Sequence, residues 1–107
     1  MARAYKNAKV DLTADTVTTL YTCPTATAAI VTSILVSEDS GNADTITVTL
    51  TNSAAAIFSL FKVKVVGTNT TVELLTRPLV VEESEVLKVK AATANRLHVV
   101  ASLLELS

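Results

Sequence analysis

The sequence predicts an all-β protein, an antiparallel β-sandwich of jelly-roll type with seven to eight strands. The clearest observation is that Ile46, Val48 and Leu50 alternate with threonines, which indicates a strand with one buried face. The second is composition, because threonine is the commonest residue, with 17 copies, and Val, Ile and Thr favour the pleated backbone. The third is that turn residues separate short apolar runs at about the 8–12-residue spacing of sandwiches.

Eight strands are expected along the chain. In order they are Tyr5–Leu12, Thr16–Cys23, Ala28–Glu38, Asp44–Thr51, Ile57–Val66, Thr70–Thr76, Glu85–Ala91 and Arg96–Leu106. Val10 and Leu12 anchor the first strand. Pro24 ends the second, because proline cannot donate a hydrogen bond to a strand ladder. No segment has a sustained helical period, and Pro78 interrupts the stretch richest in helix-favouring residues.

The third strand is the most apolar of the eight. Ile30, Ile34 and Val36 share one phase, so they are expected on one face. Val31 and Leu35 share the other phase. The sequence therefore predicts that this strand is covered on both sides.

The fourth strand follows a turn. In the fifth strand the apolar side chains change from one alternation phase to the other midway. Gly41 tolerates positive φ and marks the turn after the third strand. In the fifth strand Phe58 and Leu60 share one phase, whereas Val63 and Val65 take the other. A β-bulge near Ser59 or Leu60, or a second buried face, would reconcile the two phases.

The closing strands alternate more regularly. Leu87 and Val89 alternate with lysines, and Leu97 and Val99 are in phase until the pattern slips at Leu103. The predicted core consists of Ile46, Val48, Leu50, Val63, Val72, Leu74, Leu87, Val89 and Val99.

Composition fits one domain, residues 1–107, with residues 1–9 as an N-terminal arm. The net charge of −1 gives no basic surplus for nucleic acid, and no apolar run is long enough to span a membrane. The N-terminus has no apolar signal stretch, so we expect a soluble protein made in a cytoplasm. The single cysteine, Cys23, is expected to be a buried core thiol.

The chain shows little chemistry of the kind that enzymes use. His98 is the one histidine, and no partner ligands stand at metal-site spacing. The carboxylates of Glu82–Glu85 lack the Asp, Asn and Gly pattern of a calcium loop. No nucleophile elbow or phosphate-binding glycine loop occurs. We therefore expect no catalytic residues, no metal, no cofactor and no enzyme activity.

Three stretches together resemble small virion proteins of tailed bacteriophages. They are TVTTLYTCPTATAAIVTSILVSE, DTITVTLT and LVVEESEVLKVKAATANRLHVVASLLEL. The loop after Pro24 departs from the family pattern, which has glycine and lysine there. The resemblance implies a virion structural protein, first a capsid decoration (cement) protein that stabilises the head shell. A tail, baseplate or head–tail connector component is the alternative, and a small carbohydrate-binding module is a remote one.

The partners implied are copies of the chain and the major capsid protein, on the capsid surface of the virion. The resemblance implies a homotrimer. Surplus apolar residues give the candidates for the subunit interface, which are Tyr5, Phe58, Leu60, Val100 and Leu104. Tyr5 would anchor the N-terminal arm on a neighbouring subunit. For such an arm, deletion of residues 1–7 should leave the melting temperature nearly unchanged.

Overall fold

The computed structural model describes residues 2–107, and in this range it contains nine β-strands and no helix. The strands are β1 (Arg3–Asp11), β2 (Thr18–Thr22), β3 (Ala28–Glu38), β4 (Asp44–Thr51), β5 (Ile57–Val66), β6 (Thr71–Glu73), β7 (Leu79–Val81), β8 (Val86–Ala91) and β9 (Leu97–Leu106). The bounds of β3, β4 and β5 coincide with the predicted ones.

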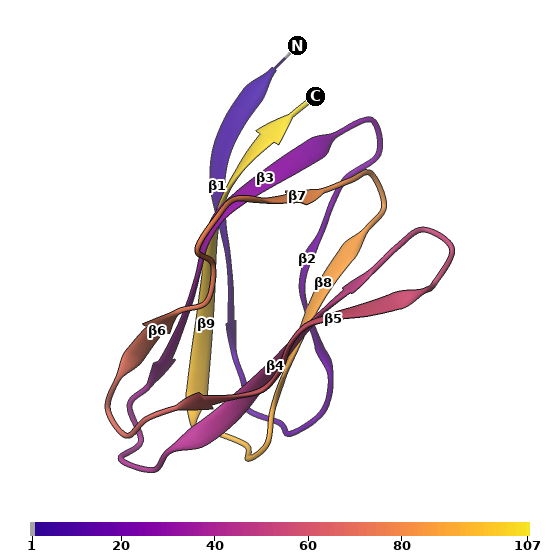
Figure 1. Cartoon of the computed structure of the whole chain (residues 1–107). Helices are drawn as coiled ribbons and strands as arrows, with labels where there is room; N and C mark the ends of the chain where they lie inside the picture. Colours follow the sequence, from indigo (N-terminus) through magenta and orange to yellow (C-terminus); the bar gives the residue numbers. More distant parts are fainter. Residues whose placement is uncertain (1) are drawn as a thin grey trace.

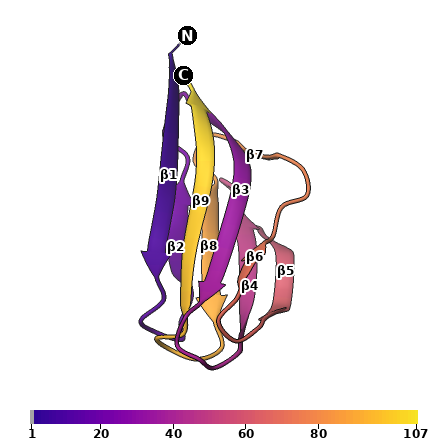
Figure 2. The same cartoon turned by 90° about the vertical axis from the view of Figure 1, so that its left-hand side faces the viewer.

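The strands form two antiparallel sheets that pack together (Figure 1). Sheet A has the order β1-β9-β3-β6, with β7 also paired to β3, and sheet B has the order β2-β8-β4-β5. In Figure 2, β1, β9 and β3 lie side by side in front of sheet B. The predicted antiparallel β-sandwich is confirmed. The jelly-roll type stays a prediction.

The core lies between the sheets and is aliphatic. Six of the nine predicted core residues are buried, namely Ile46, Val48, Leu74, Leu87, Val89 and Val99. Leu50 and Val72 are partly buried and pack against this cluster. Cys23 is buried as predicted, and its thiol donates to the carbonyl oxygen of Thr27 at 3.3 Å.

Val63 is the predicted core residue that the structure places outside, with 57% of its surface exposed. The register of β5 against β4 shifts twice, on either side of Val48. The shift at Leu60 shows that, of the two alternatives left open by the sequence, the bulge is the one present there. Val63 lies in the other shift with a φ of 54°, which is rare for a β-branched residue, and its amide donates to Thr47 Oγ1 at 3.1 Å. This second bulge turns Val63 toward solvent, so its predicted core position is wrong.

A bulge also decides which faces of β3 are buried. The register against β9 shifts between Val31 and Ser33, which leaves Thr32 as the extra residue. Because a bulge reverses the side-chain phase, Val31 is buried with Ile34 whereas Ile30 lines the outer surface. The prediction that Ile30 and Ile34 share a face is wrong for this reason.

Two short strands pair end to end along one edge of β3. β6 is shorter than the predicted strand Thr70–Thr76, and its Glu73 pairs with Leu35. β7 was not predicted as a separate strand, and its Val80 pairs with Ile30. Three residues are too few to show an alternating pattern, so only the pairing partner reveals β7 as a strand.

The buried carboxylate of Glu38 fastens two loops at one end of the sandwich. It accepts hydrogen bonds from the Ser40 amide at 2.6 Å, from the Ser40 hydroxyl, and from the Asn69 amide at 2.9 Å. The side-chain hydrogen bond from Ser40 and these amide contacts lower the pKa of Glu38 to about 2, against the opposing effect of burial. Asp44 has a similar role nearby, since its Oδ2 accepts from the Thr93 amide at 3.0 Å.

We expect the hydrogen-bonded carboxylate of Glu38 to make the folded protein less stable at low pH. The pKa of Glu38 in the folded protein lies below the ordinary value of 4.5. The ionised carboxylate therefore stabilises the fold above about pH 4.5, and this stabilisation is lost as the pH falls through about 2. Glu38→Gln should therefore lower the melting temperature at neutral pH and flatten its fall in acid. Circular dichroism melts between about pH 7 and pH 2 measure both effects. Glu82→Gln, at an exposed position, is the matched control. If the melting temperature of Glu38→Gln fell as steeply in acid as that of the wild type, Glu38 would not be the cause of the acid dependence.

The N-terminal segment forms the outer strand of sheet A. β1 pairs with β9 of the same chain from Arg3 opposite Leu106 to Asp11 opposite His98. Ala2 and Ser107 extend the pairing through backbone bonds of 2.8 and 2.9 Å. Residues 3–9 of the expected arm are therefore part of the domain's own sheet, and residue 1 lies outside the described range. A contact between this segment and a neighbouring subunit stays a prediction.

Candidate interaction surfaces

The outer face of sheet A carries exposed or partly exposed apolar side chains across its width. Cross-strand pairing places Tyr5 beside Leu104, Leu104 beside Ile30, and Ile30 beside Val80. We call these four residues the apolar row. Tyr5 is 84% exposed and Val80 is 56% exposed. An apolar patch that is exposed across several strands is typical of an interaction site.

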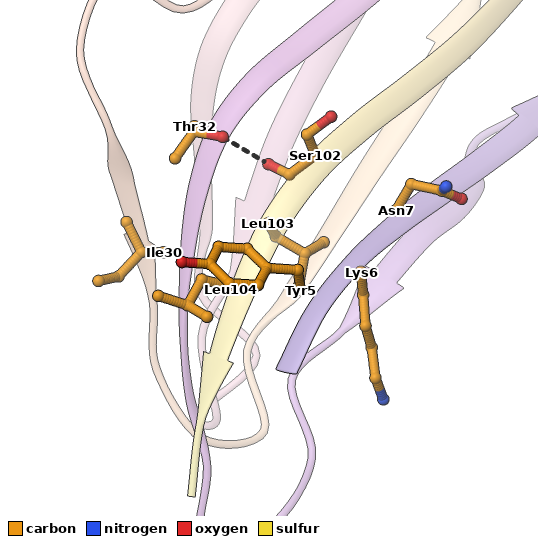
Figure 3. A pocket seen from close by; sticks show the side chains of 8 residues that line it. All are labelled: Tyr5, Lys6, Asn7, Ile30, Thr32, Ser102, Leu103 and Leu104. Atoms are coloured by element: carbon orange, nitrogen blue, oxygen red, sulfur yellow. Dashed lines mark hydrogen bonds between the residues drawn. The ribbon is translucent and has the colours of Figure 1, made fainter. Parts of the chain in front are cut away.

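A shallow hollow of about 600 Å³ lies against the apolar row. Its lining residues are Tyr5, Lys6, Asn7, Ile30, Thr32, Ser102, Leu103 and Leu104. Figure 3 shows the Tyr5 ring lying across Leu104 toward Ile30. On the polar side of the hollow the Thr32 hydroxyl donates to the carbonyl oxygen of Ser102 at 3.2 Å. The hollow thus combines an aromatic ring with hydroxyl and amide groups.

A second row crosses the same face and carries opposite charges at its ends. Lys9 of β1 pairs with Val100, Val100 with Leu35, and Leu35 with Glu73 of β6. We call these four residues the mixed row. The polar Asn7, Ser102 and Ser33, also in register, lie between the two rows.

Glu73 is held in place by the bulge of β3. Its carboxylate accepts from the Ser33 hydroxyl, from the Ile34 amide at 2.8 Å and from the Leu75 amide at 3.2 Å. Burial raises the pKa of Glu73, but these hydrogen bonds outweigh burial and leave the pKa below its usual range. Glu73 is therefore a fixed negative charge at neutral pH on the outer face of sheet A.

The structure separates the five predicted interface residues into two groups. Tyr5, Val100 and Leu104 lie together on the outer face of sheet A. Phe58 and Leu60 lie on β5, the edge strand of sheet B. Phe58 is exposed, whereas Leu60 is partly buried against the core at the bulge. The sequence could not separate the groups, because the pairing partners of the strands decide it.

β5 carries four exposed apolar side chains, Ile57, Phe58, Val63 and Val65, which we call the β5 patch, and the consecutive residues Ile57 and Phe58 point to opposite faces of the strand. An edge strand offers unpaired backbone groups to another chain. The two bulges of β5 and its exposed lysines, Lys62 and Lys64, interrupt this edge. Such features oppose regular strand addition.

The threonine face of β4 lies on the outside of sheet B. Thr49 pairs with Lys88 and Thr47 with Lys90, so the lysines that alternate with the buried residues of β8 lie beside the threonines. The threonines of this face are only partly exposed. Cross-strand packing of this kind explains the alternation without any catalytic role.

A buried polar cluster links the two sheets at one edge. Tyr21 of β2 donates to Glu105 Oε2 at 2.5 Å, and Lys6 of β1 forms a salt bridge with Glu105 Oε1 at 2.9 Å. The Tyr21 hydrogen bond, followed by Lys6, lowers the pKa of Glu105. Burial and the same carboxylate raise the pKa of Tyr21, and burial raises the pKa of the Cys23 thiol. The cluster has satisfied partners, so a structural role explains it.

The remaining polar candidates also have local partners. His98 Nε2 lies 3.2 Å from Asp11 Oδ1, and its Nδ1 lies 3.6 Å from Asp39 Oδ2. In the acidic turn, Glu85 Oε1 accepts from the Glu82 amide at 2.8 Å. Among residues 2–107, no three His, Cys, Asp or Glu side chains gather as a metal site. The same described part of the chain has no helix that could cross a membrane.

Sequence reasoning missed Ile30, Leu35 and Val80 as surface residues. The phase change within Ile30–Leu35 was the available signal, because a bulge in this stretch places both ends outside. Val80 gave no signal of its own, since it belongs to a strand of three residues.

The chain matches no protein-family model and no curated protein sequence.

Proposed function

We propose that this protein is a structural component of a phage virion, a capsid decoration protein that stabilises the head shell. The observation that carries the proposal is the apolar row, which crosses four strands of an otherwise well packed sandwich, with Tyr5 and Val80 exposed and Leu104 and Ile30 partly exposed. A surface of this kind suits a protein whose task is to bind other subunits. The resemblance of the opening, central and closing stretches to small virion proteins supports the same role.

The proposed partners are the major capsid protein and further copies of the chain on the capsid surface. For the particle-bound protein we retain the homotrimer that the resemblance implies. The outer face of sheet A and the β5 patch are two different surfaces, and a closed three-fold ring requires two different surfaces per subunit. Of the predicted interface residues, Tyr5, Val100 and Leu104 belong to the first surface and Phe58 to the second.

The alternative virion role is a tail, baseplate or head–tail connector component. Copy number separates the two roles. Quantitative mass spectrometry of purified particles should find hundreds of copies of a decoration protein, because a head surface offers many equivalent sites. A count of only a few to dozens of copies would reject decoration and favour the alternative.

The hollow beside Tyr5 supports a second candidate function, a small carbohydrate-binding module. Its exposed ring lies beside Asn7, Thr32 and Ser102, and glycan sites combine aromatic stacking with such polar groups. Against this reading, the chain has only two Tyr, two Phe and no Trp. Calorimetric titration with soluble glycans tests it. Saturable binding that Tyr5→Ala removes would favour the module over the decoration protein.

A further inference from the structure

We propose that free copies of this protein pair through the outer face of sheet A, about a two-fold axis that runs parallel to the strands. The occupant of the apolar row in solution is then the same face of a second copy. This inference goes beyond the proposed function and does not rest on it. It follows from the register and the charges of the two rows.

The two-fold rotation reverses the order of the strands across the face. β1 of one copy then lies over β6 and β7 of the second copy, and β9 lies over β3, while each row stays at its own level along the strands. In the apolar row, Tyr5 meets Val80 and Leu104 meets Ile30. Apolar side chains thus meet apolar side chains throughout this row.

The mixed row becomes complementary in charge under the same rotation. Val100 meets Leu35 near the axis, and Lys9 at one end meets Glu73 at the other. The two-fold axis creates this pair twice. In the next outward-facing row along the strands, Asp11 of one copy lies opposite Thr71 of the second copy. Thr71 is neutral, so no like charges are brought together there.

The usual geometry of packed sheets preserves these contacts. Stacked sheets lie about 10 Å apart, and aligned packing rotates them by about 30°. The ends of the mixed row lie about 7 Å from the axis, because neighbouring strands are about 4.8 Å apart. A rotation of about 30° displaces each end by about 4 Å, which the flexible Lys9 side chain can span.

The size of the face predicts a weak dimer. Four strands about 4.8 Å apart and about 30 Å long cover about 550 Å². A stable interface buries about 800 Å² per partner, so affinity in the micromolar range is expected.

The β5 patch is a poorer surface for two-fold pairing. Lys62 and Lys64 stand among its apolar residues and no carboxylate lies on β5. Pairing this strand with its own copy would bring like charges together, which is unfavourable. The outer face of sheet A is therefore the surface that matches itself.

Sedimentation equilibrium from about 1 to about 500 μM tests the proposal. The average mass should rise with concentration from 11.3 kDa toward twice that value. Leu35→Glu, near the axis and partly exposed, should keep the chain monomeric without unfolding it. A wild-type chain that stays monomeric, or that forms trimers instead, would overturn the two-fold contact. Particle copy number is independent of this result, so a failure here leaves the decoration role standing.

A charge cycle tests the Lys9–Glu73 contact itself. Lys9→Glu places two carboxylates together and should weaken pairing by at least about tenfold, less so at high salt. Adding Glu73→Gln removes that repulsion and should restore most of the affinity, while Gln keeps an acceptor for the Ile34 amide. Lys62→Glu on β5 is the matched control. An equal loss in this control, or no rescue by Glu73→Gln, would overturn the proposed geometry.

Discussion

Val48→Asp is expected to unfold the protein. Val48 is fully buried on β4, between β5 and β8 in sheet B and against sheet A. No cation lies among the buried residues of the core cluster, so the new carboxylate would be unpaired. Burying such a group costs several kcal/mol, which is comparable with the total stability of about 5–15 kcal/mol of a small domain.

The measurement is a comparison of far-ultraviolet circular dichroism and amide NMR dispersion with the wild type. Thr49→Asp is the matched control, since it adds the same charge one residue farther along β4. Thr49 faces outward and pairs with Lys88, so this variant should fold with little change in melting temperature. A folded Val48→Asp protein would show that β4 has a different register from the one described.

Deletion of residues 1–7 is expected to produce the second largest loss. It removes the pairing of Arg3–Asn7 with Ser102–Leu106 and the salt bridge from Lys6 to Glu105. About five backbone hydrogen bonds between the strands are lost, each worth about 0.5–1.5 kcal/mol, for a total of at least about 2.5 kcal/mol. The melting temperature should fall by about 10–20 °C in a domain of this size. The arm expected from the sequence predicts no change, so the two readings give opposite results.

A thermal melt of the shortened chain decides between them. Tyr5→Ser is the control, because the Tyr5 side chain is largely exposed and its backbone pairing is kept. This substitution should leave the melting temperature within a few degrees. If the shortened chain melted like the wild type, β1 would contribute no stability to the free domain and the arm interpretation would return.

Local periodicity in the sequence was sufficient to predict much of the fold. β4 was predicted with its bounds and buried face because alternation with a period of two is a local property of the chain. The bounds of β3 and β5 followed from turn residues and β-branched composition. The phase change in β5 was visible in the sequence, and a bulge near Leu60 was one of the two alternatives that it left open.

The surfaces were less predictable than the strands. Tyr5, Val100 and Leu104 were predicted as interface candidates, but only strand pairing shows that they share a face with Ile30 and Leu35. The choice between a second buried face and a bulge could not be made from the sequence, because both produce the same apolar residues in two phases.

By itself the sequence determined an aliphatic β-sandwich with a buried Cys23 and an outward threonine face on β4. Only the tertiary structure decided that Ile30 and Val63 point outward, that β7 is a strand, and that the buried Glu38 and Glu105 have hydrogen-bond partners. The physical reason is the range of the interactions. Alternation acts between neighbouring residues, whereas bulges, strand order and buried carboxylate contacts depend on residues that are distant along the chain.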